Sequence, residues 1–338
     1  MKTAVRLLVV FLVASSLCAC RHVRLSSTAE HGGLPASIAR EYEYPRCEEC
    51  QVKIEQTTER TSYTISRVQL QAVRKVNGTN RWIDVDYYRP TATTNRVPVI
   101  MVLPMLGGGY ELERHFANYF ASHGYAAAIV RRDRRQKEMK VEELDILMRQ
   151  MVVDHRQVVD WFETRPELDA NKLGIFGVSM GGIKGAILIG LESRIKAAAL
   201  GLTGGDLPFI ISHTTEAGLV RRREQELKDR NMTVEQSEQQ LREIITCDPM
   251  TYAGFVDPHK VMLVLANNDT VVPIAKGIEL KEKMNNPETI FIPGGHYTAV
   301  LAIPYIKSQS MSFFEKRFNE VSPSSRPGAS HGLAGRRR

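Results

Sequence analysis

The chain has 338 residues, of which 43% are hydrophobic and 25% are charged, with a formal net charge of +7. This is an ordinary globular composition, which excludes general disorder and allows one sizeable core. The positive charge does not indicate a nucleic-acid partner, because a tail rich in Pro, Ser and Gly holds Arg326, Arg336, Arg337 and Arg338. Residues 319–338 are expected to form a disordered basic tail.

The N-terminus has the pattern of an export signal. Lys2 and Arg6 form a basic start, and residues 7–17 form an apolar stretch that is too short to span a bilayer stably. We therefore expect residues 1–19 to be removed as a signal peptide and the mature chain to be exported to the cell envelope.

The end of this segment, Leu17-Cys18-Ala19-Cys20, resembles the lipobox of bacterial lipoproteins. The resemblance implies lipid attachment to Cys20, which would anchor the chain to a membrane that faces the periplasm. Cys18 departs from the commonest pattern, in which a small or hydroxyl residue is usual. An ordinary secretory signal therefore stays open as the alternative.

Residues 20–60 are polar with scattered Gly and Pro, which predicts a tether and a loosely packed N-terminal arm. In an oxidising compartment Cys47 and Cys50 would form a local disulfide or stay an idle pair. No second cysteine pair follows, so the spacing does not favour a zinc site.

The main domain is expected over residues 61–318 and to begin with an antiparallel hairpin. Two runs typical of strands, 63–76 and 82–88, are joined through Asn77-Gly78, a strong turn signal. Strands and helices then alternate, which predicts an α/β fold with a mostly parallel, doubly wound sheet covered on both faces. The predicted strands are 97–103, 125–131, 172–178, 195–200, 261–266 and 289–292, and the predicted helices are 111–122, 141–163, 182–191 and 274–284, with a final helical region through Phe318.

A charged helical insertion interrupts the alternation at about residues 205–254. One helix is predicted over 219–228, and Thr233 with Gln236 forms a capping box for a second. An insertion at this point is typical of a cap that shapes the substrate pocket. The basic clusters at 131–135 and 221–223 are interleaved with or followed by acids, so we expect them on solvated faces.

A strand that runs directly into Gly177-Val178-Ser179-Met180-Gly181 predicts a serine nucleophile on a sharp strand-to-helix turn. Such a turn needs small residues two before and two after the serine, and Gly177 and Gly181 meet that need. The alternative is that Ser179 only caps the following helix.

A serine hydroxyl becomes a useful nucleophile when a histidine takes its proton and a carboxylate orients that histidine. In the order typical of this turn, the acid and then the histidine follow the serine, each after a later strand. Asp269 follows the strand 261–266, and His296 follows the strand 289–292. His259 precedes a strand, which puts it at the opposite edge of the sheet.

Two backbone N–H groups should bind the charge that develops on the substrate oxygen. One is expected from Met180, the residue after the nucleophile. The other is expected from the loop after the strand 97–103, with Leu106 as the first candidate and Met105 as the next.

These segments together resemble the α/β-hydrolase superfamily: Gly177 to Gly182, Asn268 to Pro273, and Gly294-Gly295-His296. The resemblance implies a Ser-Asp-His hydrolase that works through an acyl-enzyme intermediate, with no metal and no cofactor. Many members carry His-Gly where this chain has Pro104-Met105, so the chain departs from the family's pattern at the loop of the second donor. Asp133 and Arg134 are interpreted as scaffold in a turn of this family.

The function expected from these residues is cleavage of a small-molecule carboxylic ester or acyl substrate. A peptidase or amidase like the prolyl-oligopeptidase branch is one alternative, although no large propeller domain is visible. A catalytically silent envelope binding protein is the other, because a fold does not fix a function.

Overall fold

The computed structural model describes residues 20–25, 32–46, 51–75, 79–92, 95–133 and 140–320. The predicted signal peptide, Cys47, Cys50, the Asn77-Gly78 turn and the basic tail lie outside these residues. Within them, no helix is both long and apolar enough to cross a membrane.

In the described residues ten strands form one sheet, in the order β1-β10-β9-β8-β7-β5-β6-β4-β3-β2. The strands from β10 to β6 in that order pair in parallel, and antiparallel strands extend both edges. The strands are β1 (Arg21–Val23), β2 (Val52–Glu59), β3 (Tyr63–Gln71), β4 (Trp82–Pro90), β5 (Val97–Leu103), β6 (Ala126–Val130), β7 (Leu168–Val178), β8 (Ala197–Gly201), β9 (Val261–Ala266) and β10 (Glu288–Ile292).

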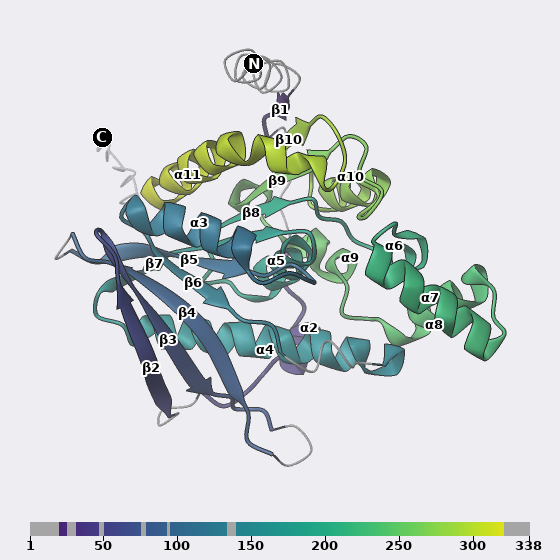
Figure 1. Ribbon diagram of the computed structural model, residues 1–338, viewed down its shortest axis with the longest axis horizontal. Helices are drawn as coiled ribbons and strands as arrows, with labels where there is room; N and C mark the ends of the chain where they lie inside the picture. The colour runs from purple at the N-terminus through teal and green to yellow at the C-terminus, as the bar shows by residue number, and fades with distance from the viewer. Residues whose placement is uncertain are drawn as a thin grey trace, which may run out of the picture.

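Helices cover both faces of the sheet, as the alternation predicts (Figure 1). Successive residues of a strand point to opposite faces, so Met101 of β5 packs with α4 and α5, while Ile100 packs with α3 and α11. The helices are α2 (Ala36–Glu41), α3 (Glu111–Ser122), α4 (Leu144–Glu163), α5 (Met180–Leu191), α6 (Leu207–His213), α7 (Ala217–Arg230), α8 (Val234–Ile244), α9 (Pro249–Tyr252), α10 (Ile274–Lys283) and α11 (Ile303–Asn319).

The N-terminal part differs from the prediction of a tether and a loose arm. β2 pairs with β3 along its whole length, and β1 pairs with β10 at the far edge of the sheet. Seven of the eight residues of β2 are exposed, so the strand shows no buried apolar alternation that a sequence pattern could reveal. Pairing of β3 with β4, with Gln71 opposite Trp82, agrees with the predicted hairpin.

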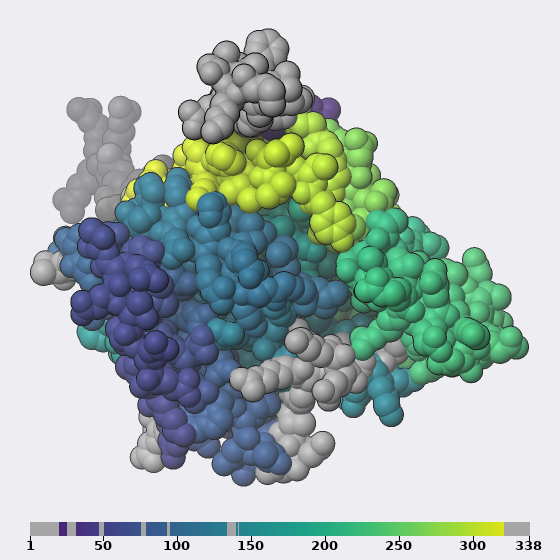
Figure 2. Space-filling view, in the orientation of Figure 1, coloured from purple at the N-terminus to yellow at the C-terminus, as the bar shows by residue number. Residues whose placement is uncertain are grey.

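The insertion forms the helices α6 to α9, and α7 and α8 project from the body of the molecule (Figure 2, green). Thr233 Oγ1 accepts the N–H of Gln236, and the side-chain oxygen of Gln236 accepts the N–H of Thr233 at 2.8 Å, so the predicted capping box is present. No residue of α7 is buried, which makes this helix an outer layer.

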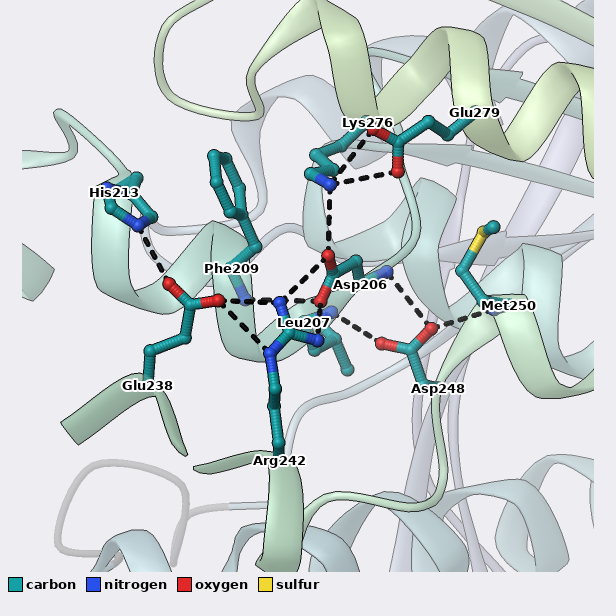
Figure 3. A network of polar contacts seen from close by, with 10 residues as sticks. All are labelled: Asp206, Leu207, Phe209, His213, Glu238, Arg242, Asp248, Met250, Lys276 and Glu279. Atoms are coloured by element: carbon teal, nitrogen blue, oxygen red, sulfur yellow. Dashed lines mark hydrogen bonds and ion pairs between the residues drawn. The ribbon is translucent and has the colours of Figure 1, made fainter. Parts of the chain in front are cut away.

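A network of polar contacts ties the insertion to the body (Figure 3). The Asp206 carboxylate, at the start of α6, lies 2.9 Å from Arg242 of α8 and 3.0 Å from Lys276 of α10. The carboxylate of Asp248 accepts the backbone N–H groups of Asp206 and Leu207. Burial raises the pKa of Asp206, but the hydrogen bonds from Arg242 and Lys276 outweigh it and lower that pKa.

Replacing Asp206 with asparagine should loosen the insertion without disturbing the backbone, because asparagine tolerates the φ of +64° at this position. Loss of the two ion pairs is expected to speed limited proteolysis within α7 and α8 by about fivefold. The matched control is Glu243→Gln on the exposed face of α8. Equal cleavage rates for Asp206→Asn and the wild type would contradict an anchoring role.

Candidate active site

Ser179 lies on a tight turn between β7 and α5. Its φ is +58°, a region that side chains other than glycine rarely adopt, so the turn holds the residue in a strained conformation. A Cβ added at Gly177 would collide with the Gly181 carbonyl oxygen, and one at Gly181 would collide with that of Leu103. The Ser179 hydroxyl makes no capping hydrogen bond to α5, so the interpretation as a simple helix cap is wrong.

The structure brings Ser179, Asp269 and His296 together at the carboxyl ends of three parallel strands. His296 Nε2 lies 3.0 Å from Ser179 Oγ, and His296 Nδ1 lies 2.8 Å from Asp269 Oδ2. Because a carboxylate only accepts hydrogen bonds, Nδ1 carries the proton and Nε2 is free to accept from the serine.

Backbone contacts fix the acid and the histidine loops. Asp269 is 4% exposed, and its Oδ1 accepts the N–H groups of Val271 at 2.9 Å and Val272 at 3.0 Å. The N–H of Asn268 donates to the Gly294 carbonyl oxygen at 2.9 Å, which joins the two loops. The spacing of the acid and the histidine therefore depends on backbone hydrogen bonds as well as on their own contact.

The loop after β5 holds two candidate N–H donors, Met105 and Leu106, and one of them is already hydrogen-bonded within the protein. The N–H of Met105 donates to Glu113 Oε1 at 2.8 Å, and Glu113 is buried. Met105 is thereby removed as a donor to the substrate, and Leu106, which lines the cavity with Ser179, remains. Met180 follows Ser179 directly, and its N–H lies at the start of α5.

Arg132 holds the other side of this loop. Its guanidinium donates to the carbonyl oxygens of Met105 and Gly107, both at 2.8 Å, and to that of Gly108. It also stacks over the ring of Tyr110, with 4.2 Å between the guanidinium carbon and the ring centroid. The expectation of a solvated face for this basic cluster is therefore wrong at Arg132.

Glu113 and Arg132 are the two site residues that sequence reasoning missed. Glu113 contacts a residue eight positions away in the chain, and Arg132 contacts residues about 25 positions away. No local sequence pattern therefore indicates either contact. The one available signal was the position of Arg132 just after a strand, at the edge of the sheet that carries the site. Asp133, interpreted as scaffold, lines the same cavity, and Arg134 lies outside the described residues.

Replacing Arg132 with lysine should misplace the loop, because an ammonium group cannot bridge the same carbonyls. We expect kcat to fall by about tenfold to a hundredfold with little change in KM, since a loop N–H that binds the substrate oxygen would act mainly in the transition state. Steady-state kinetics on a short acyl ester would measure this, with Arg221→Lys on the exposed part of α7 as the control. An unchanged kcat would show that Arg132 does not position the loop.

A cavity of about 1260 Å³ opens beside Ser179 and His296. The start of α7 supplies part of its wall, so the insertion borders the pocket as the sequence predicts. Most of its lining is apolar, and its apolar residues include Leu106, Phe116, Val178, Leu202, Val271 and Ile303. Glu216 and Arg222 of the insertion bring charge to the lining. Such a cavity suits a substrate with an apolar group.

Among the described residues, no group of three His, Cys, Asp or Glu side chains is arranged to hold a metal ion.

Residues 83–215 match the model of the Dienelactone hydrolase family. The match includes Ser179 but not Asp269 or His296. No curated protein matches the chain significantly.

The chain is similar in structure to several solved esterases. An acetyl xylan esterase from Paenibacillus sp. R4 aligns with a TM-score of 0.58 and 19% identity, over 84% of this chain and 100% of that one. Acetyl Xylan Esterase 1 from Thermoanaerobacterium sp. JW/SL YS485 gives 0.54 and 14%, over 82% and 99%. A glucuronoyl esterase from Solibacter usitatus gives 0.52 and 13%, over 80% and 91%.

The sheet order, the helices on both faces and these likenesses agree with one another. The chain has the α/β-hydrolase fold.

Proposed function

We propose that the chain is a serine hydrolase that cleaves carboxylic esters through an acyl-enzyme intermediate. The observation that carries the proposal is the pair of hydrogen bonds that links Ser179 to His296 and His296 to Asp269, at 3.0 and 2.8 Å. Distances in this range are those needed for a nucleophile, its base and the group that orients the base.

In the proposed reaction Ser179 Oγ attacks the ester carbonyl carbon while His296 Nε2 takes the hydroxyl proton. Asp269 stabilises the imidazolium that forms. The N–H groups of Met180 and Leu106 bind the negative oxygen of the tetrahedral intermediate. When the intermediate collapses, the C–O bond to the alcohol breaks, and His296 returns the proton to the leaving alkoxide.

Water completes the proposed cycle. His296 removes a proton from a water molecule, whose oxygen attacks the carbonyl of the acylated Ser179. The second tetrahedral intermediate releases the carboxylic acid, and the proton returns to Ser179 Oγ. The substrate is a small-molecule ester, whose apolar group would lie in the cavity of about 1260 Å³.

Turnover of short and medium p-nitrophenyl esters, set beside aminoacyl amides, tests this proposal. We expect ester turnover that Ser179→Ala abolishes and a far smaller rate on amides, because an amine is a poorer leaving group than an alcohol. Faster amide turnover would favour the peptidase alternative. A folded protein that turns over neither class would favour a silent binding protein.

The export and anchoring predictions are proposals of the same kind. The basic start, the short apolar stretch and the cysteine after Ala19 support lipid attachment at Cys20 and a membrane location facing the periplasm. Detergent phase partition of the chain, expressed in a bacterium that processes lipoproteins, tests this. The wild type should enter the detergent phase and Cys20→Ser should not, and equal partition of the two would exclude Cys20 as the anchor.

A further inference from the structure

A second cavity, of about 360 Å³, lies between the start of β4, the end of β6 and the helices α4 and α5. We call it the basic chamber, after Arg81, Arg131, Arg132 and Lys184 in its lining. It shares four lining residues with the cavity beside Ser179, namely Asp84, Arg131, Arg132 and Asp133. At about 30 Å³ for each water in the liquid, the basic chamber has room for a ligand of several heavy atoms.

Lys184 of α5 lines the basic chamber and is only 3% exposed. Among the described residues no hydrogen bond or ion pair is found for its ammonium group, and Glu113 acts on it only as a more distant opposite charge. Burial, and after it the charge of Arg132, lower the pKa of Lys184 to about 8, and Glu113 opposes this shift. The side chain is therefore still mainly charged at neutral pH, and a buried charge of this kind normally has a partner.

His155 of α4 also lines the chamber, and among the described residues one of its ring nitrogens is a buried acceptor without a partner. Its Nδ1 lies 2.6 Å from the Met151 carbonyl oxygen, which only accepts, so Nδ1 carries the proton. Burial lowers the pKa of His155 to about 4, which keeps the ring neutral at physiological pH. Nε2 is then a bare acceptor, and within the described part of the chain it is buried without a hydrogen-bond partner.

The carboxylates of the basic chamber are already occupied. Asp154 makes two hydrogen bonds with Arg81, at 2.8 and 2.6 Å, and Asp84 accepts one from Gln69 at 2.8 Å. Asp133 lies 3.6 Å from Arg81. Among the described residues, the lining thus leaves three polar groups without a partner: the Lys184 ammonium group, Arg81 Nε and His155 Nε2.

We propose that the basic chamber binds a small oxyanion that also carries a hydroxyl group, with an anionic oxygen on Lys184 and the hydroxyl donating to His155 Nε2. Two sources share this chemistry: a free anion such as hydrogen phosphate, and the anionic end of a substrate that reaches past Arg132 from the cavity beside Ser179. The binding itself does not rest on the proposed ester hydrolysis.

Calorimetric titration of the whole protein with hydrogen phosphate tests the proposal. We expect binding to the wild type, Kd raised about tenfold or more in Lys184→Met, and unchanged Kd in Lys228→Met, which removes an exposed lysine of α7. Lys184→Met should fold with a Tm equal to or above that of the wild type, because it removes a buried charge that lacks a partner. No phosphate binding, or equal Kd in the wild type and Lys184→Met, would overturn the proposal.

Sulfate provides a second test of the same site, because it has the charge but no hydroxyl donor at neutral pH. We expect it to bind the wild type more weakly than hydrogen phosphate does. His155→Leu should remove that preference, since the acceptor that distinguishes the two anions is gone. A wild type that binds sulfate as tightly as phosphate would contradict the role of His155.

Kinetics then distinguish the two sources. If a substrate end occupies the basic chamber, Lys184→Met should raise KM for esters whose acyl group ends in a hydroxycarboxylate and leave KM for neutral esters unchanged. If the ligand is a free anion, Lys184→Met should change neither KM, and phosphate should bind without competing with a neutral ester. The kinetic experiment depends on the proposed esterase activity, whereas the titrations do not. Failure of the proposed function can therefore be told apart from failure of the anion site.

Discussion

Ser179→Ala is expected to lower kcat on a short acyl ester by roughly a millionfold, the loss found when the nucleophile of a serine hydrolase is removed. The physical reason is that His296, 3.0 Å away, can activate only a hydroxyl at this position. Alanine also fits the strained turn no worse than serine does. The measurement is kcat for the two proteins on a p-nitrophenyl ester, with Ser122→Ala on the exposed end of α3 as control.

A double variant tests whether Ser179 and His296 depend on each other. Because Ser179 and His296 act as one unit, Ser179→Ala combined with His296→Ala should be no slower than Ser179→Ala alone. Additive losses would show that the two side chains work independently, which the proposed mechanism does not allow. A Ser179→Ala variant that keeps a tenth of wild-type kcat would rule Ser179 out as the nucleophile.

Asp269→Asn is expected to lower kcat by about ten-thousandfold, with KM little changed. An amide can donate to His296 Nδ1, which would stabilise the tautomer whose Nε2 carries the proton and cannot accept from Ser179. The remaining oxygen can still accept the N–H groups of Val271 and Val272, so the loop should keep its conformation.

The control for this second prediction is Asp229→Asn, which removes an exposed carboxylate from the end of α7. Circular dichroism and Tm of Asp269→Asn would establish that the fold is intact. A loss of kcat of less than tenfold in a folded Asp269→Asn variant would mean that another group orients His296.

Residues whose role depends on local pattern could be predicted from the sequence. The apolar strand before Ser179, with glycine on both sides, is such a pattern, because only small residues fit where β7 and α5 approach each other. The Thr233 and Gln236 capping box is another, since both of its hydrogen bonds lie within one turn of helix. The placement of Asp269 and His296 after later strands followed from the parallel order of the sheet.

Residues whose role depends on distant contacts could not be predicted. β2 joins the sheet by backbone pairing although its side chains are exposed, so no apolar periodicity marks it. Glu113 and Arg132 each resemble an ordinary charged residue near a helix or a strand end. Lys184 interrupts the apolar helix α5, but only the fold shows that it faces a cavity rather than solvent.

The most direct test of the central claim is labelling of the purified protein with a fluorophosphonate probe, which reacts with an activated serine. The wild type should label, Ser179→Ala should not, and His296→Ala should label far more slowly. A folded wild type that never labels, or a Ser179→Ala variant that labels as well as the wild type, would contradict the assignment of Ser179 as the nucleophile.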